Sequence, residues 1–85
     1  MTALFGTHLR ESRKKQRITA EMLAQDCGVS RSYITLMENN KRLPGKKIIP
    51  KIAVALNLKT STILNWYLEH IRYQLQKDLK IHPDA

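Results

Sequence analysis

The chain is poor in several features, and each shortage excludes a class of protein. Its single cysteine, Cys27, cannot form an internal disulfide and is typical of a reducing compartment. No apolar run approaches the roughly 20 residues that a membrane-spanning helix requires. The N-terminal residues lack the basic and apolar regions of a secretory signal. We therefore expect a soluble cytoplasmic domain with no membrane partner.

Patterns that carry catalysis or bind metals are also missing. There is no Ser-His-Asp set, paired carboxylates or glycine-rich phosphate loop, so the sequence does not predict an enzyme. The three histidines, His8, His70 and His82, show no metal-ligand spacing with one another or with Cys27. We accordingly expect neither a metal nor a cofactor.

Positive charge, by contrast, is abundant. The 85 residues include 15 Lys and Arg against 7 Asp and Glu, a formal net charge of +8. Such an excess on a small surface favours a polyanionic partner, and the lack of a membrane signal favours nucleic acid. The length suits one domain, and apolar residues at helical spacing predict an all-α fold.

The stretch of residues 19–40 predicts two short helices joined by a tight turn. Thr19 and Ser30 are N-cap candidates, because each hydroxyl oxygen can accept a hydrogen bond from a free amide of the first turn. Gly28 fits the left-handed position that ends the first helix. The stretch is therefore a predicted helix-turn-helix.

The second helix of this motif has an inward and an outward face. Ile34 and Met37 lie three positions apart and are expected to face the core, with Tyr33 beside them. The outward face, of the kind that enters a DNA major groove, comprises Arg31, Ser32, Thr35 and Leu36.

Three further helices are expected around the motif, at about 4–16, 47–56 and 60–80. Asn40 and Asn57 are predicted left-handed stops, since asparagine tolerates positive φ better than other non-glycine residues. The run R-K-K-Q-R over 13–17 closes the first helix, where the dipole favours cations. This run is either a solvated basic face or a phosphate contact. Four cations on the loop after the motif predict a phosphate grip: Lys41, Arg42, Lys46 and Lys47.

The last helix carries one apolar stripe. Its residues recur at spacings of four, three, four and four: Leu64, Leu68, Ile71, Leu75 and Leu79. Either the domain itself or a second copy across a two-fold axis can cover such a stripe. We expect residues 1–60 to form the helix-turn-helix core and residues 61–80 to complete it and supply a dimer interface. The predicted interface residues are Trp66, Tyr67, Ile71 and Leu75; residues 81–85 are expected to fray.

The order and spelling of these segments resemble one family. The segments are F-G-x-x-L-R, I-T-A-E-M-L-A-x-x-C-G-V-S-R-S-Y-I-T-L-M-E-N-N-K-R-L-P and I-x-x-I-A-x-A-L-N-L. From Phe5 to about Leu64 they resemble the Cro/phage-repressor helix-turn-helix family, also called xenobiotic-response-element-like or lambda-repressor-like. The resemblance implies a five-helix DNA-binding domain with an extended C-terminal helix, acting as a homodimer on a near-palindromic operator.

The resemblance also implies roles for individual residues. Base contacts map to Arg31, Ser32, Thr35 and Leu36. Of these, Arg31 can pair with guanine O6 and N7 together, and Thr35 and Leu36 can meet a thymine methyl. A structural ion pair maps to Arg10 and Glu38. The predicted phosphate contacts are Thr19, Tyr33, Asn39, Lys41, Arg42, Lys46, Lys47 and Arg13.

Four positions depart from the family pattern. Ala20 replaces a usual glutamine and Leu36 a usual polar or basic residue, which leaves the base contacts open. Asn40 replaces a usual glycine and Ser12 a usual leucine, and both changes cost stability without altering the fold.

The predicted function is that of a homodimeric DNA-binding transcriptional regulator. It would be a repressor of the phage, plasmid or restriction-modification controller kind. The alternative is an antitoxin that neutralises a toxin partner through its C-terminal helix and represses its own operon. An RNA or single-strand binder is a weaker alternative, because one Trp, three Tyr and one Phe offer no stacking platform.

Overall fold

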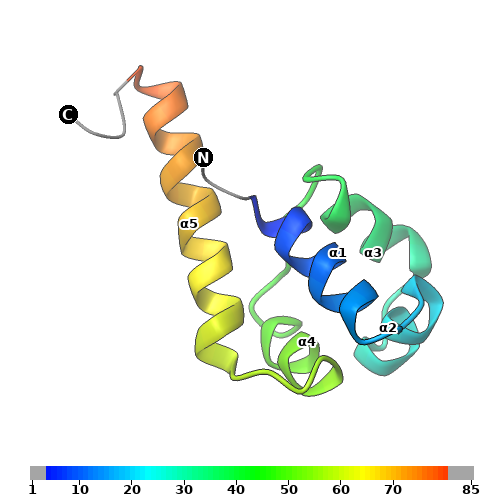
Figure 1. Ribbon diagram of the computed structural model, residues 1–85. Helices are drawn as coiled ribbons and strands as arrows, with labels where there is room; N and C mark the ends of the chain where they lie inside the picture. The colour runs from blue at the N-terminus through cyan, green and yellow to red at the C-terminus, as the bar shows by residue number, and fades with distance from the viewer. Residues whose placement is uncertain (1–3, 81–85) are drawn as a thin grey trace.

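Five helices and the loops between them make up the computed structural model, which describes residues 4–80 (Figure 1). They are α1 (Phe5–Lys15), α2 (Ala20–Cys27), α3 (Arg31–Glu38), α4 (Ile49–Ala55) and α5 (Thr60–Asp78). No strand occurs in this part of the chain. The predicted five-helix, all-α fold is confirmed.

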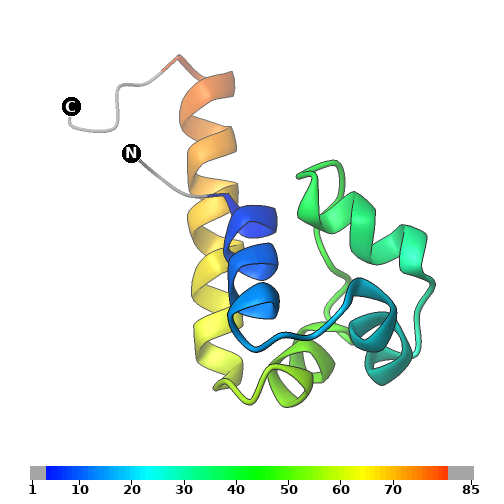
Figure 2. The same cartoon turned by 45° about the vertical axis from the view of Figure 1, so that its right-hand side comes forward.

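The helices close around one core. Each packs against two others, in the spatial order α1, α3, α2, α4, α5 and back to α1 (Figure 2). Large side chains from all five helices are fully buried between them: Phe5, Leu9, Leu23, Ile34, Met37, Ile52, Leu56 and Ile63. Burying apolar surface of this kind is the main favourable term in folding.

Local side-chain chemistry sets the ends of the two motif helices. Thr19 Oγ1 accepts a hydrogen bond from the Met22 amide at 3.1 Å, and Ser30 Oγ accepts one from the Tyr33 amide at 3.1 Å. Gly28 follows α2 with φ 67°. Both predicted N-caps and the predicted left-handed glycine are confirmed.

Four non-glycine residues within the described chain follow helices with positive φ, and one of them is Lys80 after α5, with φ 55°. Asn40 has φ 59° and Asn57 has φ 54°, as predicted. Arg17, after α1, has φ 58°, which the sequence did not indicate. Its conformation closes the helix, since the Ile18 amide donates to the Arg13 carbonyl at 3.1 Å.

The first half of α5 packs against α1. The helix follows Lys59 as its N-cap, and no side chain caps it there. The Trp66 ring stands edge-on to Phe5, with centroids 6.1 Å apart, and stacks on His8 at 5.2 Å. Tyr67 also packs against the core. Trp66 and Tyr67, predicted as dimer contacts, are therefore half-buried against their own domain, Trp66 by contact with α1. Their place in a dimer interface remains a prediction.

The predicted leucine stripe of α5 faces outward instead. Leu64, Leu68, Leu75 and Leu79 are 43%, 52%, 53% and 64% exposed, and Ile71 is half-buried among them. The C-terminal part of α5 extends past the other helices (Figure 2). None of the helices within residues 4–80 has the length and apolarity to cross a bilayer. The predicted frayed tail, residues 81–85, lies outside the described residues.

A buried histidine joins α5 to the first turn of α1. His70 is 3% exposed, and its Nδ1 accepts a hydrogen bond from the Phe5 amide at 3.1 Å. That amide has no partner within α1, and Leu4 at the N-cap provides no side-chain acceptor. Burial lowers the pKa of His70 by disfavouring the charged ring.

This environment predicts that acid destabilises the fold. In the unfolded chain His70 binds a proton below pH about 6.5, whereas in the folded chain it stays neutral to lower pH. The free energy of unfolding should therefore hold above pH 6.5 and fall below it, by at most about 1.4 kcal/mol per pH unit. Urea titrations between pH 5 and 7 measure this slope. His70→Asn keeps an acceptor without a titrating ring and should flatten it; an unchanged slope in that variant would assign the effect to another group.

Candidate nucleic-acid interface

The outward face of α3 is free of the core. Arg31, Ser32, Thr35 and Leu36 are exposed and together line a shallow hollow. Ile34 and Met37, on the opposite side of the helix, are fully buried. The predicted division of α3 into an inner and an outer face is confirmed, and contact with bases remains a prediction.

The base of α3 is held by an ion pair that the sequence assigned only in part. The Glu38 carboxylate accepts from Arg13 Nε at 2.6 Å and from Arg13 Nη2 at 2.9 Å, with the two side chains 6% and 13% exposed. Arg13 Nη1 also donates to the Ile18 carbonyl at 2.8 Å. Hydrogen bonding to Glu38 raises the pKa of Arg13. A two-pronged pair of this kind fixes both position and direction.

Two predicted roles change with this geometry. Arg10 does meet Glu38, at 3.5 Å, but it is the outer of the two partners, and its Nη2 donates to Asn39 Oδ1 at 2.8 Å. Arg13 was predicted as a phosphate contact, yet its side chain is only 13% exposed and its three guanidinium nitrogens are all engaged within the domain. The structure thus makes Arg13 the principal structural arginine and not a free cation.

A close approach of backbones also joins α1 to α3. The Gly6 amide donates to Asn40 Oδ1 at 2.8 Å. A Cβ at Gly6 would overlap the Met37 and Glu38 carbonyl oxygens, so only glycine lets the two helices meet here. Asn40 thus does more than replace a family glycine, because its side chain caps α1.

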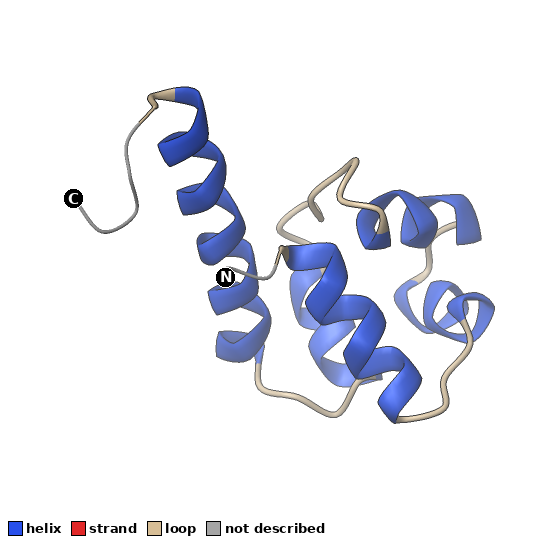
Figure 3. Ribbon diagram, turned by 45° about the horizontal axis from the view of Figure 1, so that its top comes forward, coloured by secondary structure: helices blue, strands red, loops and turns tan. Residues whose placement is uncertain are grey.

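The loop between α3 and α4, one of the tan segments in Figure 3, is basic, and Tyr33 contacts it at two points. The Gly45 amide donates to the Tyr33 hydroxyl at 3.1 Å, and the Arg42 guanidinium lies 4.6 Å from the Tyr33 ring centroid. Pro44 is buried, which fixes the middle of the loop. Four cations remain exposed along it: Lys41, Arg42, Lys46 and Lys47. Tyr33 therefore shapes the predicted phosphate grip.

Thr19 and Asn39, the remaining predicted phosphate contacts, are exposed at the ends of α2 and α3. Each already has one partner, since Thr19 caps α2 and Asn39 binds Arg10. Both can add a contact to phosphate, because hydroxyl and amide groups have further hydrogen-bonding capacity.

One contact on this face had no sequence signal. Arg31 Nη1 donates to Glu21 Oε1 of α2 at 3.2 Å, across the turn of the motif. The two side chains are 67% and 72% exposed. Their ten-residue separation is not a helical spacing, so only the fold brings them together.

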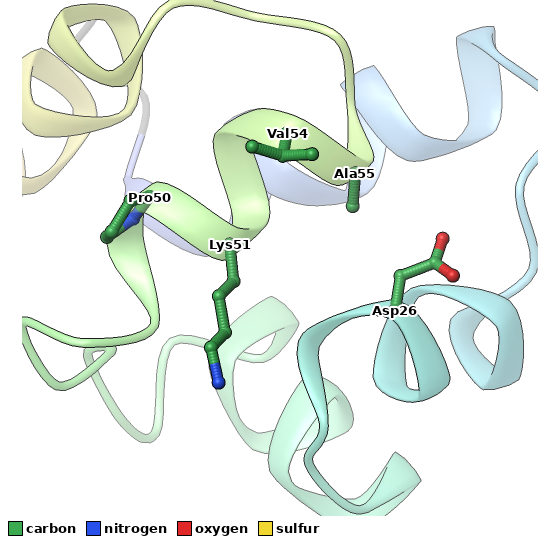
Figure 4. Close-up of a pocket in the computed structure, with 5 residues that line it drawn as sticks. All are labelled: Asp26, Pro50, Lys51, Val54 and Ala55. Atoms are coloured by element: carbon green, nitrogen blue, oxygen red, sulfur yellow. The ribbon is translucent and has the colours of Figure 1, made fainter.

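A second hollow lies away from this face, between α2 and α4. Its lining comprises Asp26, Pro50, Lys51, Val54 and Ala55, and its volume is about 510 Å³ (Figure 4). Figure 4 shows Asp26 of α2 across the hollow from Ala55, the last residue of α4. Cys27, next in the chain, is 1% exposed, and burial raises the pKa of its thiol, which makes it unreactive.

Comparison with known proteins gives consistent results. A family model described as helix-turn-helix matches residues 9–63. The restriction-modification controller protein C.AhdI from Aeromonas hydrophila is 34% identical; the match covers 69% of this chain and 89% of that one, with a TM-score of 0.66. The P22 c2 repressor in complex with a synthetic operator is 28% identical over 76% of this chain and 98% of that one, with a TM-score of 0.71.

A curated relative is a 10 kDa protein of the ImmF control region of Bacillus phage phi105. It is 29% identical over 58 residues, which are 68% of this chain. The matched part spans 64% of the relative, less than two thirds of its length.

The ion-pair geometry predicts unequal effects of two arginine substitutions. Arg13→Ala leaves a buried carboxylate without its main partner and should cost about 3 kcal/mol of unfolding free energy. Arg10→Ala removes a mainly exposed partner and should cost less than about 1 kcal/mol. Urea unfolding of both variants measures the difference. A larger loss in Arg10→Ala would mean that Arg10 is the principal partner of Glu38.

Proposed function

This chain belongs to the helix-turn-helix family, and from that premise we propose that it is a sequence-specific regulator of transcription that binds double-stranded DNA. It acts as a homodimeric repressor of the phage, plasmid or restriction-modification controller kind, in the cytoplasm of its host. The proposed role is one of binding and involves no catalytic step.

The observation that carries this proposal is the exposed face of α3. α3 begins after the Ser30 cap and carries four exposed side chains that take no part in the core. A helix of this kind fits the width of a major groove. Arg31 offers two parallel donors to guanine, and the Thr35 methyl and Leu36 offer apolar contact to thymine. These side chains are proposed to read sequence.

Charge on the neighbouring loop supports the same proposal. Lys41, Arg42, Lys46 and Lys47 are exposed beside α3, on a loop that Tyr33 holds in place. Contacts from such cations to phosphates add affinity and salt dependence without reading sequence. We therefore assign affinity to the loop and selectivity to α3.

Known relatives support a regulatory role. C.AhdI is a controller in restriction-modification, and the P22 c2 repressor binds a synthetic operator. The phi105 relative is a protein of the ImmF control region. All three names describe proteins of gene control or restriction-modification control.

For the homodimer, we propose the outward stripe of α5 as the two-fold interface. Leu64, Leu68, Ile71 and Leu75 recur every three or four residues, and three of the four are at least 43% exposed. A stripe of this spacing is suited to packing against its own copy. Two α3 helices would then read successive major grooves about 34 Å apart.

The antitoxin alternative rests on the same stripe. A toxin in place of a second copy would cover the same leucines, while α3 would still bind the operon's DNA. The oligomeric state of the isolated chain separates the two roles, because only the first requires self-association.

Selection of binding sites from random duplex DNA tests the function. We expect an inverted repeat with half-sites about one helical turn apart. On the selected site Arg31→Ala should lose about 1–3 kcal/mol of binding free energy and relax the base preference at one base pair per half-site.

Two other results would count against this assignment. If selection enriches no sequence and binding only weakens with salt, the net charge of +8 acts alone and the chain is not a specific regulator. If Arg31→Ala weakens cognate and random DNA equally, Arg31 contacts a phosphate and a different residue reads the base.

A substitution on the stripe tests the dimer. Leu68→Glu puts like charges across the two-fold axis and should convert dimer to monomer, with weaker binding to a two-half-site operator. The matched control is Val54→Glu on α4, where an 82% exposed side chain lies off the stripe. Analytical ultracentrifugation measures both variants. A Leu68→Glu variant that stays as dimeric as the control would place the interface elsewhere.

A further inference from the structure

The contact between Glu21 and Arg31 assigns a role to a residue outside the predicted interface. We propose that Glu21 is a specificity-determining positioning residue, which holds the Arg31 guanidinium toward a base edge and away from phosphates. This inference rests on the proposed function, since it concerns how that function selects sequence.

The ion pair between Glu21 and Arg31 contributes little to the stability of the fold. With the side chains 67% and 72% exposed, its Coulomb energy is small and largely screened by water and salt. Within residues 4–80 the Glu21 side chain makes no hydrogen bond or ion pair other than the one with Arg31. The consequence of the contact therefore falls on Arg31 itself, whose long side chain otherwise samples many rotamers.

The contact leaves the reading edge of Arg31 free. A guanidinium has five N–H donors, and the hydrogen bond to Glu21 uses only one of them, on Nη1. Two parallel donors remain for guanine O6 and N7. Arg31 borders both the hollow of the α3 face and the groove between α2 and α3, which Glu21 also lines. Glu21 thus holds the guanidinium through one nitrogen and leaves its other donors free.

The negative charge of Glu21 also weakens the contact of Arg31 with phosphates of random DNA. A phosphate that takes Arg31 must approach a carboxylate 3.2 Å from the same guanidinium and meets repulsion there. A guanine edge is neutral and is not penalised in that way. Specificity of this kind arises from a cost placed on the wrong partner as well as from a gain with the right one.

Two substitutions separate positioning from charge. Glu21→Ala removes both the charge and the acceptor, while Glu21→Gln removes the charge but keeps an oxygen acceptor, a weaker one than a carboxylate. Binding is measured on the selected operator, on an operator changed at the base pair that Arg31→Ala relaxes, and on random duplex. The matched control is Asp26→Ala, which removes the same charge from the same helix, on the side that faces α4.

We expect the preference for the operator over the changed site to fall about two- to fivefold in Glu21→Ala and less in Glu21→Gln. Binding to random DNA should tighten equally in both, because both lose the same charge. Asp26→Ala should leave the preference unchanged. In the Arg31→Ala background, Glu21→Ala should remove no further preference at that base pair.

Each opposing result has a separate meaning. If Glu21→Ala tightens all three DNAs by one factor and keeps the preference, Glu21 is an ordinary surface carboxylate and the inference is overturned. A loss of preference that persists in the Arg31→Ala background overturns it too, because Glu21 then acts without Arg31. If the unsubstituted chain itself shows no preference, the proposed function fails instead.

Discussion

The position of α3 depends on a carboxylate buried at its last residue. Glu38 lies between two arginines of α1, and the two-pronged contact with Arg13 fixes the axis of α3 relative to α1. About two turns before Arg13 in α1, Gly6 lets the backbones of α1 and α3 meet, and its amide donates to the Asn40 side chain. A helix only eight residues long has little stability alone. Its direction, and that of every side chain on its outer face, comes from these contacts.

Three surfaces of the domain carry different tasks in this arrangement. The outer face of α3 offers shape and hydrogen-bonding groups, the loop after it offers charge, and the stripe of α5 offers apolar area. The spatial order of helices keeps α5 away from α3, since α5 packs on α1 and α4. A partner on the stripe therefore leaves the α3 face open.

What the sequence predicted well was local. Thr19, Ser30 and Gly28 act within three residues of their own position, so their chemistry alone locates the helix ends. The two faces of α3 follow from a spacing of three, which a helix imposes. Asn57 ends α4 for a similar reason, because few other residues accept its backbone conformation.

The sequence did not show which of two similar residues, or which of two similar helix faces, would be packed inside the domain. Arg10 and Arg13 lie three apart on one helix, so periodicity could not say which would be buried against Glu38. The same holds for α5, which has two apolar faces at helical spacing. One face comprises residues 63, 66, 67 and 70, and the other comprises residues 64, 68, 71 and 75. Only the packing of Trp66 on His8 and Phe5 showed that the first face turns inward. His70 gave no signal, because its partner is a backbone amide 65 residues away.

The freedom of the α3 face has a consequence for how such a domain diverges. Arg31, Ser32, Thr35 and Leu36 touch nothing on which folding depends, so each can be exchanged at little cost in stability. The base preference that we propose for this face can thus change while the fold is kept. Under the proposed function, duplicated copies of the gene can acquire new binding sites on DNA through a few substitutions. A library randomised at these four codons would sample such binding preferences directly.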